Sequence, residues 1–264
     1  MISQRKRGQR AVFLLKALFV ILAVAFTLPL GGCSEDPILE ESRVYNINDD
    51  IRSLKIDIIA ADLTVEKADR FYVETNLRYL SVSINGDTLI LKDKKDTPVT
   101  FKGGILKVGI PADGFFEFDS LSISTGAANL MADSLSAKAL ELKLGAGNVT
   151  IGSLSASESA KIDGGAGKFT VLDGVIKNMT LNMGVGDLSM TAALLGKNEM
   201  NFSIGRSELN LAGSREDYSI EIEKGIGTVR VDGIEVTDFG TSAGNLGSVK
   251  LKGGIGEINI TFTE

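Results

Sequence analysis

The chain has 264 residues, of which 28 are basic and 34 acidic, with 30 glycines, 4 prolines, 1 cysteine and no histidine. The lack of histidine removes the most frequent general base of enzymes and the commonest zinc ligand. A net charge of −6 argues against nucleic acid as a partner, because phosphate binding needs a basic surface.

The first 32 residues have the pattern of a secretion signal. Basic residues at Arg5, Lys6, Arg7 and Arg10 precede an apolar run over residues 17–30, which is too short and wrongly flanked for a spanning helix. A twin-arginine signal is disfavoured because Lys6 separates the first two arginines. Removal of residues 1–32 takes away five basic residues and leaves 23 against 34 acidic ones, a net charge of −11.

The apolar run ends in Leu30-Gly31-Gly32-Cys33, which resembles the lipobox of bacterial lipoproteins. The resemblance implies that the Cys33 thiol is alkylated with diacylglycerol, with palmitate as a typical acyl chain, and that the chain is cut just before it. Ordinary secretory cleavage before a cysteine is the alternative. Two acyl chains suffice for stable attachment. We therefore expect an extracytoplasmic protein, lipid-anchored to the bacterial cell membrane or outer membrane.

An acidic segment follows the cysteine. Residues 33–43 contain Glu35, Asp36, Glu40 and Glu41 around one proline, and they predict a short tether. Residues 44–264 are predicted to form one β domain.

A Gly-x-Gly turn recurs along this domain at intervals of 19 to 21 residues, as in LELKLGAGNVTI around Gly145. On both sides of each turn apolar and polar residues alternate, which is the period of a strand with one buried face. Glycine suits corners where a Cβ atom would clash. We predict an all-β fold, a parallel β-solenoid of roughly 20-residue two-strand coils, because such a unit becomes stable only by stacking on its neighbours. The first turn residues are Gly126, Gly145, Gly165, Gly184, Gly205, Gly225 and, after 29 residues, Gly254.

The N-terminal portion, from Phe71 to Phe118, is β-rich and aromatic, and the repeat is blurred there. Asn85-Gly86 between two apolar runs predicts a hairpin. The aromatic residues predict a larger core that blunts the end of the solenoid, in preference to an aromatic ligand platform. They are Phe71, Tyr72, Tyr79, Phe101, Phe115, Phe116 and Phe118.

Two features of the C-terminal region bear on partners. The insertion from Thr237 to Ser248 is rich in glycine and small polar residues, and it predicts a mobile projecting loop, either a harmless insertion or a binding loop. The last coil ends in INITFTE without an obvious cap, so its open ladder predicts a site for end-to-end self-association.

The stretches LKVGIPADGFFEFDSLSISTGAANL and ALELKLGAGNVTI resemble the putative-adhesin family of bacterial β-strand-repeat domains, known as domain of unknown function 4097. The resemblance covers about residues 44–264 and rests on the Ile110-Pro111 step followed by tandem Gly-x-Gly coils. It implies an extracytoplasmic or membrane-associated protein, and it carries over no catalytic residue. The chain departs from the pattern where Ser207 replaces the second glycine of a turn.

These features favour a non-catalytic, adhesin-like interaction surface over an enzyme. No cofactor or metal is expected, because the glycine-rich turns have Phe169 and Ile258 where a calcium repeat needs aspartate. The expected partners are the membrane, through Cys33, and an unidentified protein or glycan. The alternatives are a self-assembling structural component and a stress-sensing accessory of the cell envelope.

Overall fold

The structure is a computed structural model that describes residues 39–48, 50–94, 103–112, 116–237, 239–240 and 244–263. The chain divides into two compact units, Met1–Asp36 and Pro37–Glu264, and the described residues all belong to the second. The predicted signal peptide and Cys33 therefore lie outside the described residues. Within the described ranges, no helix has the length and apolar character needed to cross a membrane.

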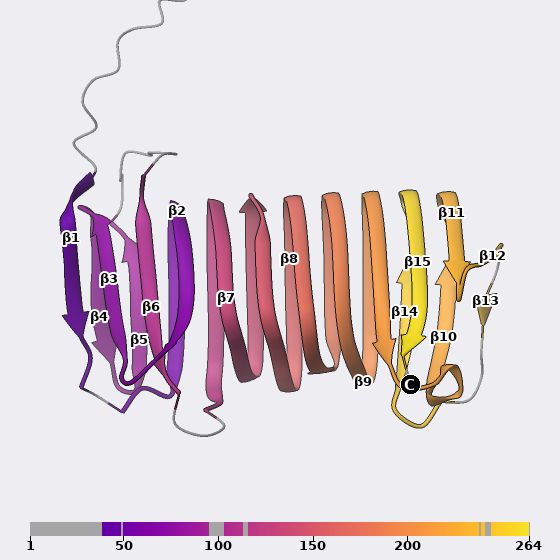
Figure 1. The fold of residues 1–264 in the computed structure, drawn as a ribbon, viewed down its shortest axis with the longest axis horizontal. Coiled ribbons are helices and arrows are strands. Elements are labelled where there is room, and N and C mark those ends of the chain that lie inside the picture. Colours follow the sequence, from indigo (N-terminus) through magenta and orange to yellow (C-terminus); the bar gives the residue numbers. More distant parts are fainter. Residues whose placement is uncertain are drawn as a thin grey trace, which may run out of the picture. The chain divides into compact units, whose positions relative to one another are not determined.

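The second unit is built from strands and one short 3₁₀ helix, so the predicted all-β class is confirmed (Figure 1). The elements are β1 (Leu39–Asn46), β2 (Ser53–Ala68), β3 (Tyr72–Leu77), β4 (Leu80–Asn85), β5 (Thr88–Asp93), β6 (Ile105–Pro111), β7 (Phe118–Ala146), β8 (Val149–Lys177), β9 (Met179–Ala212), η1 (Arg215–Asp217), β10 (Tyr218–Glu223), β11 (Ile226–Val231), β12 (Ile234–Val236), β13 (Phe239–Gly240), β14 (Gly247–Lys252) and β15 (Ile255–Thr263).

Successive coils stack in parallel register, as the repeat predicts. Leu130 on β7 pairs with Val149 on β8, and Ala160 on β8 pairs with Met179 on β9. Leu140 and Leu142 point into the core, while Lys143, the next residue of the same strand, is exposed. Alternation along each strand thus gives every coil one buried face, and stacking joins these faces into a continuous core.

The corners need glycine for two reasons. The second glycine of a turn has positive φ, as at Gly186 (+145°) and Gly205 (+141°), where other residues are strained. Gly205 pairs with Gly256 and is therefore the second glycine of its turn, with Ser203 in the first place. The prediction that Gly205 opens the turn and that Ser207 replaces its second glycine is therefore wrong. A Cβ atom on Gly205 would also lie 1.7 Å from the carbonyl oxygen of Gly186 in the neighbouring coil. The backbones of adjacent corners therefore approach too closely for any side chain.

The last coil does not lie at the end of the stack, and the prediction of an open ladder at INITFTE is wrong. β14 lies between β9 and β10, and β15 lies between β9 and β11 (Figure 1). Val249, for example, pairs with Asn198 on one side and Ile220 on the other. This order is possible because the corners align, with Gly256 of this coil paired to Gly205 on one side and to Gly227 on the other.

The insertion from Thr237 to Ser248 is the return connection that this order requires, and the described part does not form a projecting loop. Phe239–Gly240 pairs antiparallel with β10, and Gly247 and Ser248 already belong to β14. The Leu246 amide donates a 2.9 Å hydrogen bond to the carbonyl oxygen of Asp217. Crossing back over the β10–β11 coil accounts for the extra residues.

Antiparallel strands complete the N-terminal end. Before its corner β2 pairs with β5, and β4 follows β5 outward. After the corner β2 pairs with β6, which is followed outward by β3 and then β1. The predicted β4–β5 hairpin is present, with Asn85 paired to Thr88 across a turn at Gly86. Residues 39–43, which we assigned to the tether, form the first part of β1.

The described phenylalanines of this end, Phe71, Phe116 and Phe118, pack into the core as expected, whereas Tyr72 and Tyr79 are half-buried and lie outside it. The rings of Phe116 and Phe118 lie 4.7 Å apart edge to face, and Phe71 lies 5.4 Å from Phe116. Such edge-to-face contacts add to the burial of apolar area. Phe101 and Phe115 lie outside the described residues.

Candidate functional site

A groove of about 370 Å³ opens beside the N-terminal end of the solenoid and is the best candidate for a ligand site. We call it the serine groove, because four serines of β7 and β8 line it. The lining residues are Glu66, Lys67, Ile110, Pro111, Ala112, Phe116, Phe118, Ser134, Ser136, Ser153 and Ser155.

The four serines form a regular array. Ser134 pairs with Ser153 and Ser136 pairs with Ser155 across adjacent parallel strands. The leucines between them, Leu135 and Leu154, are fully buried, so alternation turns the serines outward. All four serines are half-buried, and in the described part of the chain none of their hydroxyls has a hydrogen-bond partner. Each hydroxyl therefore has a donor and acceptor capacity left for a ligand.

Two charged side chains of opposite sign, Glu66 and Lys67, border the groove. The Tyr72 hydroxyl donates a short hydrogen bond to Glu66 Oε1. This hydrogen bond to the carboxylate, together with partial burial, raises the pKa of Tyr72 to about 12. Lys67 is exposed on the same rim, and its backbone amide donates to Asp133 Oδ2 at 3.2 Å. The rim carries both signs of charge and suits a polar ligand without a large charge of its own.

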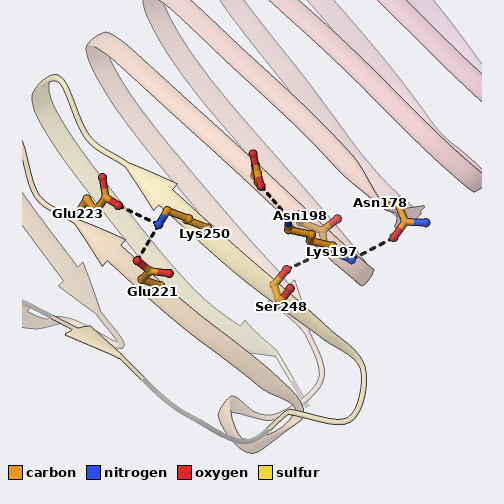
Figure 2. A network of polar contacts seen from close by, with 8 residues as sticks. Asn178, Lys197, Asn198, Glu221, Glu223, Ser248 and Lys250 are labelled. Atoms are coloured by element: carbon orange, nitrogen blue, oxygen red, sulfur yellow. Dashed lines mark hydrogen bonds and ion pairs between the residues drawn. The ribbon is translucent and has the colours of Figure 1, made fainter.

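A second face of the solenoid carries charges that neutralise one another (Figure 2). Lys250 Nζ lies 2.7 Å from Glu221 Oε1 and 2.8 Å from Glu223 Oε1. Its hydrogen bond lowers the pKa of Glu223, and both carboxylates raise the pKa of Lys250. Exposed pairs of this kind contribute little to stability. Their main effect is to leave this face without a strong field for a charged partner.

The corners also form an exposed aliphatic row, which we call the corner ridge. The residue just before the second glycine of the turn is Val185, Ile204, Ile255 and Ile226 in successive coils, aligned by the strand register. These side chains are 54%, 49%, 52% and 73% exposed. Contiguous apolar surface of this kind is typical of interaction sites.

Sequence reasoning missed both the serine groove and the corner ridge. The signal for the ridge is in the printed sequence, since the middle residue of the turn changes from alanine at Ala146 and Ala166 to larger aliphatics. The groove has no such signal, because β2, β6 and β7 meet there only in the fold. Cys33, the one site predicted from sequence, lies outside the described residues and stays a prediction. Among the described residues no cluster of three or more acidic, histidine or cysteine side chains is placed to hold a metal.

Residues 79–261 match the family described as Toastrack DUF4097. The chain belongs to this family. None of the curated proteins compared with the chain matches it.

Several solved structures are similar to this chain. A protein of Bacteroides fragilis described as a putative adhesin is 15% identical, with a TM-score of 0.51 over 87% of this chain and 100% of that one. A putative adhesin of Parabacteroides distasonis is 15% identical over 84% of this chain and 96% of its own, with a TM-score of 0.43. A putative cell adhesion protein of Clostridium sporogenes is 13% identical over 84% and 99%, with a TM-score of 0.38. At these identities the first likeness concerns the fold alone.

Proposed function

We propose that this protein is a non-catalytic, adhesin-like lipoprotein, anchored through Cys33, that presents its solenoid outside the cytoplasm. The serine groove is the observation that carries the interaction role. Four hydroxyls without partners, a carboxylate, an ammonium group and the partly buried Phe116 ring suit hydrogen bonding and apolar contact with a neutral polar group of a partner. Glycans and proteins both display such groups.

The chemistry of the groove favours binding over catalysis. A serine hydroxyl is a weak nucleophile until a neighbouring base removes its proton. The chain has no histidine to act as that base, and the Glu66 carboxylate of the groove already accepts a hydrogen bond from the Tyr72 hydroxyl. We therefore assign the serines to ligand contact.

The interaction role is tested by screening the chain from residue 34 onward against glycan and protein arrays. We expect binding to fall at least tenfold in the double variant Ser136→Val, Ser155→Val. The matched control is Ser122→Val, Ser124→Val, because those serines are also half-buried but lie on the other side of the corner at Gly126. Equal loss in both double variants, or no loss in the first, would remove the groove from the function.

The anchor is tested separately in the bacterial host. Labelled palmitate should enter the native protein and not the Cys33→Ser variant, and the variant should leave the membrane fraction. Retention of label or of membrane attachment by the variant would contradict lipidation at Cys33.

The alternative of a self-assembling envelope component was based on an open ladder at the C-terminal coil. That coil is enclosed between two others, so this argument for the alternative no longer holds. No feature of the described residues favours a stress-sensing role. The adhesin-like role is therefore the one we retain.

A further inference from the structure

The strands that end the sheet differ in how well they are protected from further pairing. In the described part, β1, β4, β12 and β13 each pair with a single strand. β12 and β13 have only 3 and 2 residues, and short edges offer little to a partner. β1 has a register shift between Leu39 and Arg43 and carries Glu40, Glu41 and Arg43, so both a bulge and charges protect it.

β4 has none of these protections. Its sequence, Leu-Ser-Val-Ser-Ile-Asn, contains no charge and no proline, and its register with β5 is unbroken from Leu80 to Asn85. Ser83, Ile84 and Asn85 are exposed. An uncharged, regular edge of this kind is a template for another strand.

The hydrogen-bond pattern shows which backbone groups of β4 face outward. The Lys94 amide donates to the Tyr79 carbonyl oxygen at 3.1 Å, which makes this antiparallel pair a hydrogen-bonded one. Because such pairs alternate, Ser81 and Ser83 bond to β5, and Leu80, Val82 and Ile84 direct their amide and carbonyl groups away from it. In the described part these three residues have no further partner for those groups.

The edge of β4 lies at the foot of a step. In one layer β6, β3 and β1 extend three strands beyond β2, whereas in the other β5 and β4 extend only two (Figure 1). β1 therefore overhangs β4 by about one strand width, about 4.8 Å. On β1, Tyr45 packs against the core, and Arg43 on the same side has a buried Nε atom without a hydrogen-bond partner. The Arg43 guanidinium is held in place by Glu40 and by the Leu77 carbonyl oxygen, so the overhang supplies an apolar contact through Tyr45.

We propose that β4 accepts one extended, uncharged strand of a partner protein by strand addition, beside Leu80–Ile84 and beneath β1. Its inward side chains would be apolar, continuing the row of Leu80, Val82 and Ile84, and its outward ones small and polar, continuing the serines. A second copy of the chain does not pair through the same edge side by side, because its own β1 would meet the first β1 at the step. This site is separate from the serine groove and does not depend on it.

The probe is a fluorescent peptide with the sequence of β4 itself, which has the required alternation and no charge. We expect saturable binding to the chain from residue 34 onward, measured by fluorescence anisotropy. The matched probe carries N-methyl groups on alternate amides, and it should not bind in the register where those amides face β4.

Val82→Pro is the decisive variant. The Val82 amide points outward, so proline there removes no bond to β5 yet blocks the edge. We expect peptide affinity to fall at least tenfold with only a small change in melting temperature. Ser83→Lys is a second variant that keeps the Val82 side chain and places a charge on the edge, and we expect several-fold weaker binding.

Absence of saturable binding overturns the proposal, as does equal binding by the native chain and both variants. Dimerisation of the native chain that Val82→Pro abolishes, seen by sedimentation, also overturns it, because the occupant would then be a second copy.

Discussion

The side-chain amide of Asn198 donates a 3.1 Å hydrogen bond to the carbonyl oxygen of Ser248, which lies 50 residues away in sequence (Figure 2). The same side chain accepts from the Met179 amide at 3.0 Å and donates to the carbonyl oxygens of Leu195 and Gly196. Asn198 is fully buried and stands beside Val249 in an otherwise apolar column. It joins the inserted C-terminal coil to the two coils before it.

Replacement of this amide should destabilise the whole unit. Asn198→Ala leaves several buried backbone groups without a partner, and we expect the free energy of unfolding to fall by about 1–3 kcal/mol. Denaturant unfolding measures the change. The control is Asn259→Ala, since Asn259 is half-buried and no hydrogen bond joins its side chain to the described residues. A smaller effect at Asn198 than at Asn259 would contradict the role of the buried amide.

Hydrogen exchange should distinguish an inserted coil from a terminal one. We expect the amides of Val249–Leu251 and Ile258–Ile260 to exchange as slowly as those of the central coils, because strands flank them on both sides. Fast exchange confined to these amides would mean that the coil lies at the end of the stack.

Truncation before Gly247 should have a large effect for the same reason. It removes β14 and β15 and exposes the edges of β9, β10 and β11 together. We expect loss of cooperative unfolding and aggregation in size-exclusion chromatography. A truncated chain that stays monomeric and unfolds cooperatively would show that the neighbouring coils can close the gap.

Glycine at the corners is predicted to be irreplaceable. Gly205→Ala combines a strained φ with contact to the Gly186 carbonyl oxygen, and we expect a loss of at least about 2 kcal/mol of unfolding free energy. Gly86→Ala is the matched control, because Gly86 also has positive φ (+62°) but open space around its Cβ position, so about 1 kcal/mol is expected. Equal losses at both sites would mean that the strained φ alone, and not the close approach of adjacent coils, causes the loss of unfolding free energy.

The contact between Tyr72 and Glu66 predicts a pH effect at the serine groove. The hydrogen bond to the carboxylate favours the neutral phenol, so Tyr72 should ionise with a pKa of about 12. In Glu66→Gln the accepting charge is gone and the pKa should fall toward its ordinary value of 10.0. Ultraviolet absorbance of the phenolate, as a difference from Tyr72→Phe, isolates this residue among the four tyrosines. A Tyr72 pKa that Glu66→Gln leaves unchanged would contradict this assignment.

The amino-acid sequence by itself determined the all-β class, the coil length and the corners. Alternation around Leu140 and Leu142 and the glycines from Gly126 to Gly225 are local signals, because strand period and positive φ are set within a few residues. The β4–β5 hairpin at Gly86 was predictable for the same reason.

Only the tertiary structure decided the order of the coils, because the near-identical corners do not mark where the coil from Gly247 to Thr263 belongs in the stack. Local pattern does not decide its place, and contacts such as Asn198 with Ser248 do. The serine groove and the step between β1 and β4 likewise arise from strands far apart in sequence. Their geometry depends on which strands become neighbours, and that is fixed by packing of the whole unit.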